Sequence, residues 1–249
     1  MMIKEKIKTG TLYGVGVGPG DPELMTMKAF KVLSSSGAVA VPRASDSSSD
    51  GMSQALLIVK KAIDLNDKKI LQLLFPMTKD KAVLKESRQK AVEEIAEELK
   101  AGQDVAFITL GDPMLYSTFS YLVPLLKEIL PEAEVKTIPG VTSFSAGMSS
   151  AALPLAESNE KVIIIPAAYD VEEVKEHLKS FDTLVLMKVN RIFDKLLDLL
   201  VELGLEENSI FISRVGWPEE KIVTDIKSLK GQKLDYFSMV IVKRNINER

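Results

Sequence analysis

The sequence predicts an α/β protein built from two α/β domains, and three observations lead to this fold class. Segments typical of buried strands alternate with segments typical of amphipathic helices along the whole chain. Glycine, proline or polar residues follow strand after strand. The length of 249 residues and the hydrophobic fraction of 46% suffice for one large core or two small ones.

In the N-terminal part, short apolar runs predict the strands and periodic apolar stripes predict the helices. The predicted strands are residues 11–17, 38–41, 70–74 and 104–110. The predicted helices are residues 22–33, 53–63, 82–100 and 118–130, the third of which is charged and amphipathic and ends before Gly102. Residues 43–53 are rich in serine and aspartate, so we expect a mobile loop there.

A second alternating series follows a connector at about residue 131. Its predicted strands are residues 135–138, 161–166, 183–187, 209–215 and 237–242. Its predicted helices are residues 142–152, 171–181 and 192–203. We therefore place a domain boundary near residues 131–139, which gives domains of residues 1–134 and 135–249.

Composition excludes several kinds of site. The chain has no cysteine and one histidine, His177, so a zinc site of these ligands is ruled out and a Ser-His-Asp triad lacks support. We expect no protein-bound metal. The net charge of -3 indicates no strong basic field for nucleic acid. The sequence shows no signal-peptide pattern and no apolar run of membrane-spanning length, so we expect a cytoplasmic protein without a membrane partner.

The glycine-rich segment 14–21 follows the first strand and precedes a helix, as a dinucleotide-binding turn does. It departs from that fingerprint because Pro19 or Asp21 occupies the third glycine position, depending on the glycine that is counted first. A carboxylate there repels a pyrophosphate at a helix N-terminus. The structural alternative is that Asp21 caps the helix and Pro22 takes its first position.

The segment 110–118 places similar groups after another predicted strand. Gly111 permits close approach to the backbone, and Asp112 offers a carboxylate. Ser117 and Thr118 offer hydroxyls, although the whole segment also suits a simple helix cap.

Three further segments contribute to the same pattern. The small residues of 142–152 indicate close packing, either by a ligand or by a sheet. Segment 186–191 ends a strand with Lys188 and Arg191, although it also suits a solvated, charged strand end. Segment 213–218 is another strand end, with glycine and the single tryptophan. Because ligands bind at the carboxyl ends of strands in open α/β sheets, the segments together predict a polar small-molecule site.

The motifs resemble those of the tetrapyrrole methylase superfamily, in order and spacing, over nearly the whole chain. They are Val-Gly-Val-Gly-Pro-Gly-Asp-Pro at 15–22, Leu-Gly-Asp-Pro at 110–113 and Pro-Gly-Val-Thr-Ser at 139–143. Segments 111–118, 186–189 and 214–220 are similar to the precorrin-2 and cobalt-precorrin-2 C-20 methyltransferases of cobalamin biosynthesis. The resemblance implies two α/β domains with S-adenosylmethionine held between them, S-adenosylhomocysteine as a product, a tetrapyrrole substrate and a homodimer.

The resemblance also implies which residues form the site. The cofactor contacts carried over by motif are Pro19, Leu110, Gly111, Asp112, Ser117, Thr118, Thr142, Ser143, Met187, Val215, Gly216 and Met239. The loop that contains Gly18 and Gly20 would face the macrocycle. We expect Arg43, Lys188 and Arg191 to bind the carboxylates of the macrocycle.

The chemistry follows from the reactants. A sulfonium methyl is already activated and a meso carbon of a reduced tetrapyrrole is nucleophilic, so alignment and exclusion of water are the main requirements. A proton must also leave the macrocycle. Asp21 is the favoured acceptor, with Tyr116 or Lys188 as alternatives.

Other interpretations remain open. The chain is alternatively a sister methylase that acts at another ring carbon, or a methylase of the same fold that acts on rRNA or in diphthamide synthesis. A dinucleotide-dependent oxidoreductase is a further alternative, against which Pro19 and Asp21 argue, and a non-catalytic binding module leaves the motifs unexplained. The sequence leaves open whether cobalt is already in the ring.

Overall fold

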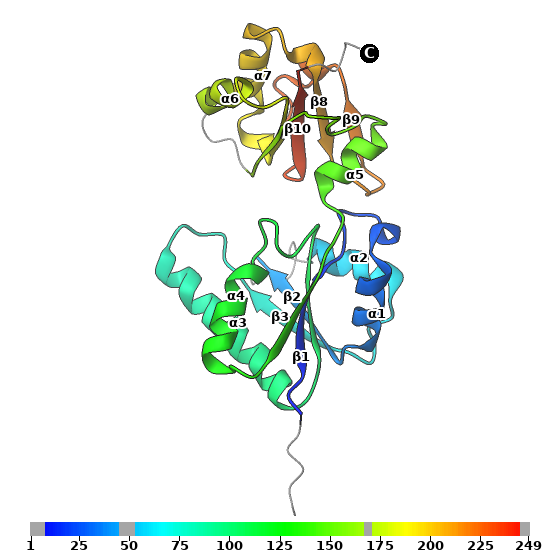
Figure 1. Ribbon diagram of the computed structural model, residues 1–249, viewed down its shortest axis with the longest axis vertical. Helices are drawn as coiled ribbons and strands as arrows, with labels where there is room; N and C mark the ends of the chain where they lie inside the picture. Colours follow the sequence, from blue (N-terminus) through cyan, green and yellow to red (C-terminus); the bar gives the residue numbers. More distant parts are fainter. Residues whose placement is uncertain (1–7, 45–52, 167–170, 245–249) are drawn as a thin grey trace, which may run out of the picture. The chain divides into compact units, whose positions relative to one another are not determined.

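The computed structural model describes residues 8–44, 53–166 and 171–244. The chain divides into two compact units, Met1–Thr142 and Ser143–Arg249. Each unit contains its own five-stranded sheet with helices packed against it (Figure 1). The predicted α/β fold class is therefore confirmed.

The sheet of the first unit is entirely parallel, with the strand order β3-β2-β4-β1-β5. Its strands are β1 (Thr11–Gly16), β2 (Ala38–Arg43), β3 (Lys69–Leu74), β4 (Val105–Thr109) and β5 (Glu134–Ile138). Its helices are η1 (Pro22–Leu24), α1 (Met27–Ser35), α2 (Gln54–Ala62), α3 (Lys81–Lys100) and α4 (Phe119–Ile129). A parallel sheet is buried on both faces, which explains the near-continuous apolar runs of its central strands.

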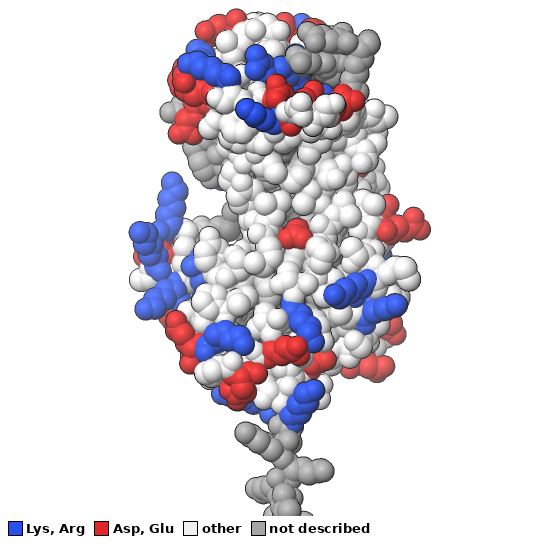
Figure 2. Space-filling model, viewed as in Figure 1, with Lys and Arg blue, Asp and Glu red and all other residues white. Residues whose placement is uncertain are grey.

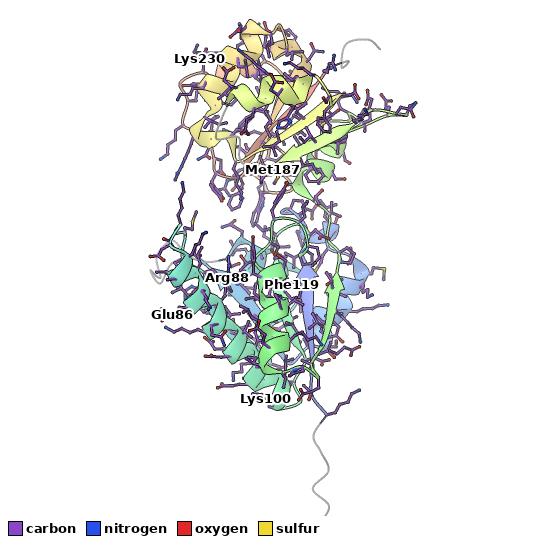
Figure 3. The ribbon with its side chains drawn as sticks, turned by 60° about the vertical axis from the view of Figure 1, so that its left-hand side comes forward. Glu86, Arg88, Lys100, Phe119, Met187 and Lys230 are labelled. Carbon is purple, nitrogen blue, oxygen red and sulfur yellow. The ribbon has the colours of Figure 1, made fainter. Side chains whose placement is uncertain are left out.

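Helices α3 and α4 cover one face of this sheet, and α1 and α2 cover the other (Figure 1). Under α4, the fully buried ring of Phe119 lies with its centroid 5.6 Å from that of Phe107 on β4 (Figure 3). A β-carbon on Gly14 would come within 2.3 Å of the Phe119 ring. Gly14 lies inside β1, in agreement with the predicted strand 11–17, and lets α4 pack closely on the strand.

The chain connections of the first sheet run in opposite directions on the two sides of the β1–β4 pair. These two strands are neighbours, yet the chain leaves β1 towards α1 on one face and leaves β4 towards α4 on the other (Figure 1). In open parallel sheets, such a switch point creates a crevice at the carboxyl ends of the strands. The loops after β1, β4 and β5 carry the three glycine motifs, and all three lie at this edge.

The sheet of the second unit is mixed, with the order β6-β7-β10-β8-β9. Strand β10 runs antiparallel to both β7 and β8, whereas β6 and β7 are parallel. The strands are β6 (Val162–Ile165), β7 (Thr183–Met187), β8 (Ser209–Ser213), β9 (Lys221–Val223) and β10 (Ser238–Lys243). The helices are α5 (Ser143–Ser150), α6 (Val171–Leu178), η2 (Val189–Arg191), α7 (Phe193–Glu202), η3 (Glu206–Asn208) and η4 (Ile226–Leu229).

The two faces of the second sheet are covered differently. Alternate residues such as Leu186, Phe211 and Val240 form a core with the apolar stripes of α6 and α7. Helix α5 packs on the opposite face, where a β-carbon on Gly147 would lie 2.8 Å from the Met239 side chain. The small residues of α5 thus permit close packing of the helix on the sheet, one of the two roles that we expected for them.

Some predicted elements need correction. The predicted helix 22–33 is two pieces, because Met25 and Thr26 have extended backbones and the Thr26 hydroxyl caps α1 through the Ala29 N–H (3.1 Å). The division between the units follows Thr142 rather than residue 134, because β5 pairs with β1 along its length. Strand β9 and the helices η2, η3 and η4 were not predicted. Most of the predicted mobile loop, residues 45–52, lies outside the described residues.

Candidate active site

Three loops pack backbone against backbone at the carboxyl edge of the first sheet. Gly18 and Gly111 form an isolated antiparallel bridge, in which the Gly111 N–H donates to the Gly18 carbonyl (2.9 Å). A β-carbon on Gly140 would come 2.0 Å from the Gly111 carbonyl oxygen, and one on Gly16 would come 2.4 Å from it. Gly16 and Gly140 must therefore lack a β-carbon for the loops to meet, whereas Gly18 and Gly111 have positive φ angles (80° and 63°) that favour glycine.

Asp112 joins two of these loops. Its Oδ2 accepts the Gly140 N–H (3.0 Å), and its Oδ1 accepts the Met114 N–H (2.8 Å). The carboxylate therefore connects the loop after β4 to the loop after β5. Both oxygens of this expected cofactor contact are bonded to protein backbone; the Met114 bond is a local cap, as the structural alternative for this segment had it, whereas the bond to Gly140 was not predicted.

Asp21 lies at the end of the loop after β1. Its Oδ1 accepts the Glu23 N–H (2.9 Å) and Pro22 takes the first position of η1, so the capping role is confirmed. The side chain is half-buried, and its Oδ2 bonds to none of the described residues. Gly18, Pro19 and Gly20 before it are buried.

The loop after β4 holds further predicted site residues. Ser117 is buried, and its hydroxyl donates to Thr109 Oγ1 (3.3 Å) and accepts the Phe119 N–H (3.2 Å). The hydroxyl of Thr118, which is half-buried, caps no backbone N–H of α4. Tyr116 has a left-handed backbone (φ 52°) and an exposed side chain. Of the two neighbouring hydroxyls, Thr118 is therefore better placed for a ligand than Ser117.

The remaining predicted residues of this unit lie beside the same loops. Leu110 and Thr142 are half-buried, and a β-carbon on Gly111 would lie 4.0 Å from the Thr142 Cα. Arg43 ends β2, and its Nη1 donates to Gln72 Oε1 on the neighbouring strand β3. Its guanidinium is therefore held at the sheet edge by Gln72, in addition to any role in binding substrate.

Four predicted cofactor residues lie together at one edge of the second sheet. Met187, at the end of β7 (Figure 3), pairs with Met239 of β10. The carboxyl ends of β7 and β8 flank the amino end of β10, because both strands run antiparallel to it. Val215 and Gly216 follow β8, and Val215 is only 5% exposed. Ser143, also of this unit, is half-buried at the start of α5.

Left-handed residues follow both of these strands directly. Lys188 after β7 has a φ of 56°, and Arg214 after β8 has a φ of 49°. The Lys188 N–H donates to the Ser238 carbonyl (2.8 Å), and the Arg214 N–H donates to the Phe237 carbonyl (2.9 Å). Residues with a β-carbon avoid this conformation, so the surrounding contacts must hold it.

The charged groups at this edge have distinct surroundings. Lys188 and Arg191, both predicted to bind substrate, are exposed, and the Lys188 ammonium lies 5.9 Å from the centre of the Tyr236 ring. The Gly216 N–H donates to the Glu220 carboxylate, so this backbone donor is already used. Asp235, which pairs with Arg214, was not predicted from the sequence; its position two residues before Phe237, typical of an Asx turn, was the available signal.

The sequence of the chain matches the model of a known family. The family model for tetrapyrrole (corrin/porphyrin) methylases matches residues 11–230, which include all three glycine motifs. The chain belongs to the tetrapyrrole methylases. The resemblance expected from the motifs is therefore confirmed.

Individual methylases match over almost the whole length. The chain is 38% identical over 236 residues to the probable cobalt-precorrin-2 C(20)-methyltransferase of Methanocaldococcus jannaschii, a match that covers 94% of this chain and 96% of the relative. It is 32% identical to the cobalt-precorrin-2 C(20)-methyltransferase of Salmonella typhimurium, over 94% of this chain and 97% of the relative.

A solved structure supports the fold. The uroporphyrin-III C-methyl transferase of Thermus thermophilus, complexed with S-adenyl homocysteine, matches with a TM-score of 0.65 at 20% identity. The match covers 96% of this chain and 100% of that structure. At this level of identity, the likeness concerns the fold alone.

The described parts of this methylase offer no cluster of metal ligands and no membrane-spanning helix. Within them, no group of three or more His, Cys, Asp or Glu side chains is arranged to hold a metal ion, and the expectation of no protein-bound metal stays a prediction. No helix in the described ranges has the length and apolar character needed to cross a membrane. Positive and negative side chains are intermingled on the visible face of each unit (Figure 2).

Proposed function

We propose that this methylase transfers a methyl group from S-adenosylmethionine to C-20 of precorrin-2 or cobalt-precorrin-2 in cobalamin biosynthesis. The observation that carries the proposal is the 38% identity to a probable cobalt-precorrin-2 C(20)-methyltransferase, which extends over 94% of this chain. The glycine loops at the switch point support it, because they explain why the segment 14–21 departs from a dinucleotide fingerprint. Its backbone packs on neighbouring loops instead of on a pyrophosphate.

We further propose which residues bind the cofactor. In the first unit they are Pro19, Leu110, Gly111, Asp112, Ser117, Thr118 and Thr142, with Thr118 rather than Ser117 as the main hydroxyl. In the second unit they are Ser143, Met187, Val215, Gly216 and Met239.

The edge of the second sheet at the carboxyl ends of β7 and β8 suits a ligand with hydrogen-bonding groups at its periphery. The backbone N–H and C=O of Val215 bond to none of the described residues, although Val215 is only 5% exposed. The Ser238 Oγ is also buried without a described partner. Buried polar groups nearly always have a partner, so the ring nitrogens and amine of an adenine, or the polar groups of a homocysteine, fit here.

When bound, S-adenosylmethionine supplies an activated methyl group. The chain must align the substrate carbon and exclude water, and positioning of this kind lowers a barrier by about 7–11 kcal/mol. Lys188 and Arg191 are the exposed cations proposed to bind substrate carboxylates, together with Arg43 beside Gln72. Gly18 and Gly20 are proposed to border the macrocycle, and the homodimer stays a prediction.

We propose Asp21 as the acceptor of the proton that leaves the macrocycle, with Tyr116 as the alternative. Asp21 uses Oδ1 for the helix cap, while Oδ2 bonds to none of the described residues. One carboxylate can therefore hold the turn and accept a proton at the same time.

Methyl transfer is tested with purified protein, S-adenosylmethionine and precorrin-2, with and without cobalt in the ring. The expected product, measured by mass spectrometry, carries one additional methyl group only when both reactants are present. The cobalt and cobalt-free arms show which ring is used. No mass gain with either ring would reject the proposed function.

Binding provides a separate test. At a hundredfold excess over its dissociation constant, S-adenosylhomocysteine should raise the free energy of unfolding by about 2.7 kcal/mol. Thermal unfolding with and without the ligand measures this, with NADP as the comparison. A shift with NADP and none with S-adenosylhomocysteine would favour the oxidoreductase alternative.

A further inference from the structure

Arg214 is the structural outlier next to the proposed cofactor contacts of the second unit. It has a left-handed backbone (φ 49°), which a residue with a β-carbon rarely adopts. Val215 and Gly216 follow it directly, so its φ and ψ set the direction of their backbone. An outlier of this kind persists only where surrounding contacts hold it.

Asp235 supplies contacts that hold Arg214. Its Oδ2 accepts the Arg214 Nε–H (2.7 Å), and its Oδ1 accepts the Phe237 N–H (2.7 Å). The Arg214 N–H in turn donates to the Phe237 carbonyl (2.9 Å), and the guanidinium carbon lies 6.0 Å from the centre of the Phe237 ring. One carboxylate thus connects the turn after β8 to the start of β10.

We propose that Asp235 and Arg214 are positioning residues, whose ion pair holds the turn after β8 in the conformation that binds S-adenosylmethionine. The inference rests on the proposed function, because it takes the backbone of Val215 as a cofactor contact. Neither side chain needs to touch the ligand. The pair acts through the Arg214 backbone, which orients the N–H and C=O of Val215, two groups that bond to none of the described residues.

The pair is poorly placed to serve stability alone. The side chains of Arg214 and Asp235 keep 32% and 28% of their surface exposed. Ion pairs in contact with solvent contribute little to the free energy of unfolding. Loss of this pair should therefore change ligand affinity more than the melting temperature.

The first variant is Asp235→Ala. Without the carboxylate, Arg214 relaxes towards ordinary backbone angles. The apparent affinity then falls in proportion to the fraction of molecules that keep the binding conformation. We expect the dissociation constant of S-adenosylhomocysteine to rise about tenfold, with a rise in the KM for S-adenosylmethionine and little change in kcat.

The second variant separates backbone conformation from side-chain contact. Glycine populates positive φ about as readily as negative φ, so Arg214→Gly permits the left-handed turn without Asp235. The double variant Asp235→Ala/Arg214→Gly should recover affinity to within about threefold of wild type. Arg214→Gly alone should also bind nearly normally.

Trp217 provides a direct readout at this turn. It is the only tryptophan in the chain, and its backbone N–H donates to the Arg214 carbonyl (3.0 Å). Titration of its fluorescence with S-adenosylhomocysteine should give the dissociation constant of each variant. Glu207→Ala, which removes the Lys227–Glu207 ion pair (2.9 Å) elsewhere in this unit, is the matched control and should bind as wild type.

The outcomes separate this inference from the proposed function. Normal affinity in Asp235→Ala would overturn the positioning role while leaving the function intact. Weak binding by Arg214→Gly would overturn it as well, because it would show a direct contact of the guanidinium with the ligand. Failure of the wild-type protein to bind S-adenosylhomocysteine would reject the proposed function itself.

Discussion

The carboxyl edges of the two sheets are shaped in different ways. In the first unit, glycines bring three loops into direct backbone contact, through the Gly18–Gly111 bridge and the close approach of Gly140. In the second unit, residues with side chains, Lys188 and Arg214, take the left-handed positions after β7 and β8. The Lys188 backbone bonds to Ser238 of β10, and Arg214 bonds to Phe237 and Asp235, which precede β10.

The difference shows two routes to a binding edge. Glycine makes an unusual backbone accessible through local sequence, so the first edge is visible as motifs. A strained arginine or lysine needs tertiary contacts, so the second edge exists only after the sheet has formed. We expect an added side chain to disrupt the backbone contacts of the loops in the first unit. Glycine in place of Lys188 or Arg214 should leave the turns of the second unit intact or stabilise them.

The largest expected effect is that of Asp21→Asn, which tests whether the loops of the first unit take part in catalysis or only fix the backbone. Asn caps a helix about as well as Asp, so Asp21→Asn should leave the melting temperature nearly unchanged. If the carboxylate accepts the proton, single-turnover methyl transfer should fall by about 10²–10⁴-fold. A wild-type rate would show that Asp21 only caps the helix.

Gly140→Ala tests the backbone contact directly. The new β-carbon would lie 2.0 Å from the Gly111 carbonyl oxygen and 2.8 Å from the Gly16 Cα, and neither backbone can move aside easily. Overpacking of this kind should lower the free energy of unfolding by about 3 kcal/mol, measured by denaturant unfolding.

Gly231→Ala is the control for this substitution. Gly231 has a φ of 73° but no atom within 4 Å of a built β-carbon, so only conformational strain of about 1 kcal/mol is expected. Equal losses in the two variants would contradict the account of the first edge.

Asp112→Ala should have an intermediate effect. It removes the acceptor of the Gly140 and Met114 N–H groups, and loss of a charged partner should lower stability by about 2 kcal/mol. Asp112→Asn keeps one acceptor oxygen and should lose less. If both variants unfold like the wild type, Asp112 does not connect the loops.

Lys188→Gly should have a smaller effect on the free energy of unfolding than Gly140→Ala or Asp112→Ala, and it should stabilise the protein, whereas those two variants destabilise it. Relief of the left-handed backbone (φ 56°) should raise the free energy of unfolding by about 1 kcal/mol. Lys195→Gly, inside α7, should instead lower it by about 1 kcal/mol. A loss of stability in Lys188→Gly would show that its side chain, rather than the contacts of its backbone, stabilises the turn.

Most of the architecture was predictable from the sequence, because the apolar runs of strands such as β4 and β7 have a local signature. The break between η1 and α1 was not, because the Thr26 cap interrupts a continuous apolar pattern. The boundary after Thr142 depends on the pairing of β5 with β1, which is a long-range contact.

The candidate site was predictable as far as its glycines and motif residues. The partners that modify their roles were not, because they come from distant positions: Gly140 for Asp112, Gln72 for Arg43 and Glu220 for the Gly216 N–H. Asp235 carries no motif of its own, and its importance is visible only beside the strained Arg214.

The central claim is the position of the transferred methyl group. The most direct test uses S-adenosylmethionine labelled with ¹³C in its methyl group and (cobalt-)precorrin-2 as substrate, followed by NMR assignment of the labelled carbon in the product. The account predicts a single labelled methyl at C-20 of the macrocycle. A label at any other ring carbon, or none, would contradict it.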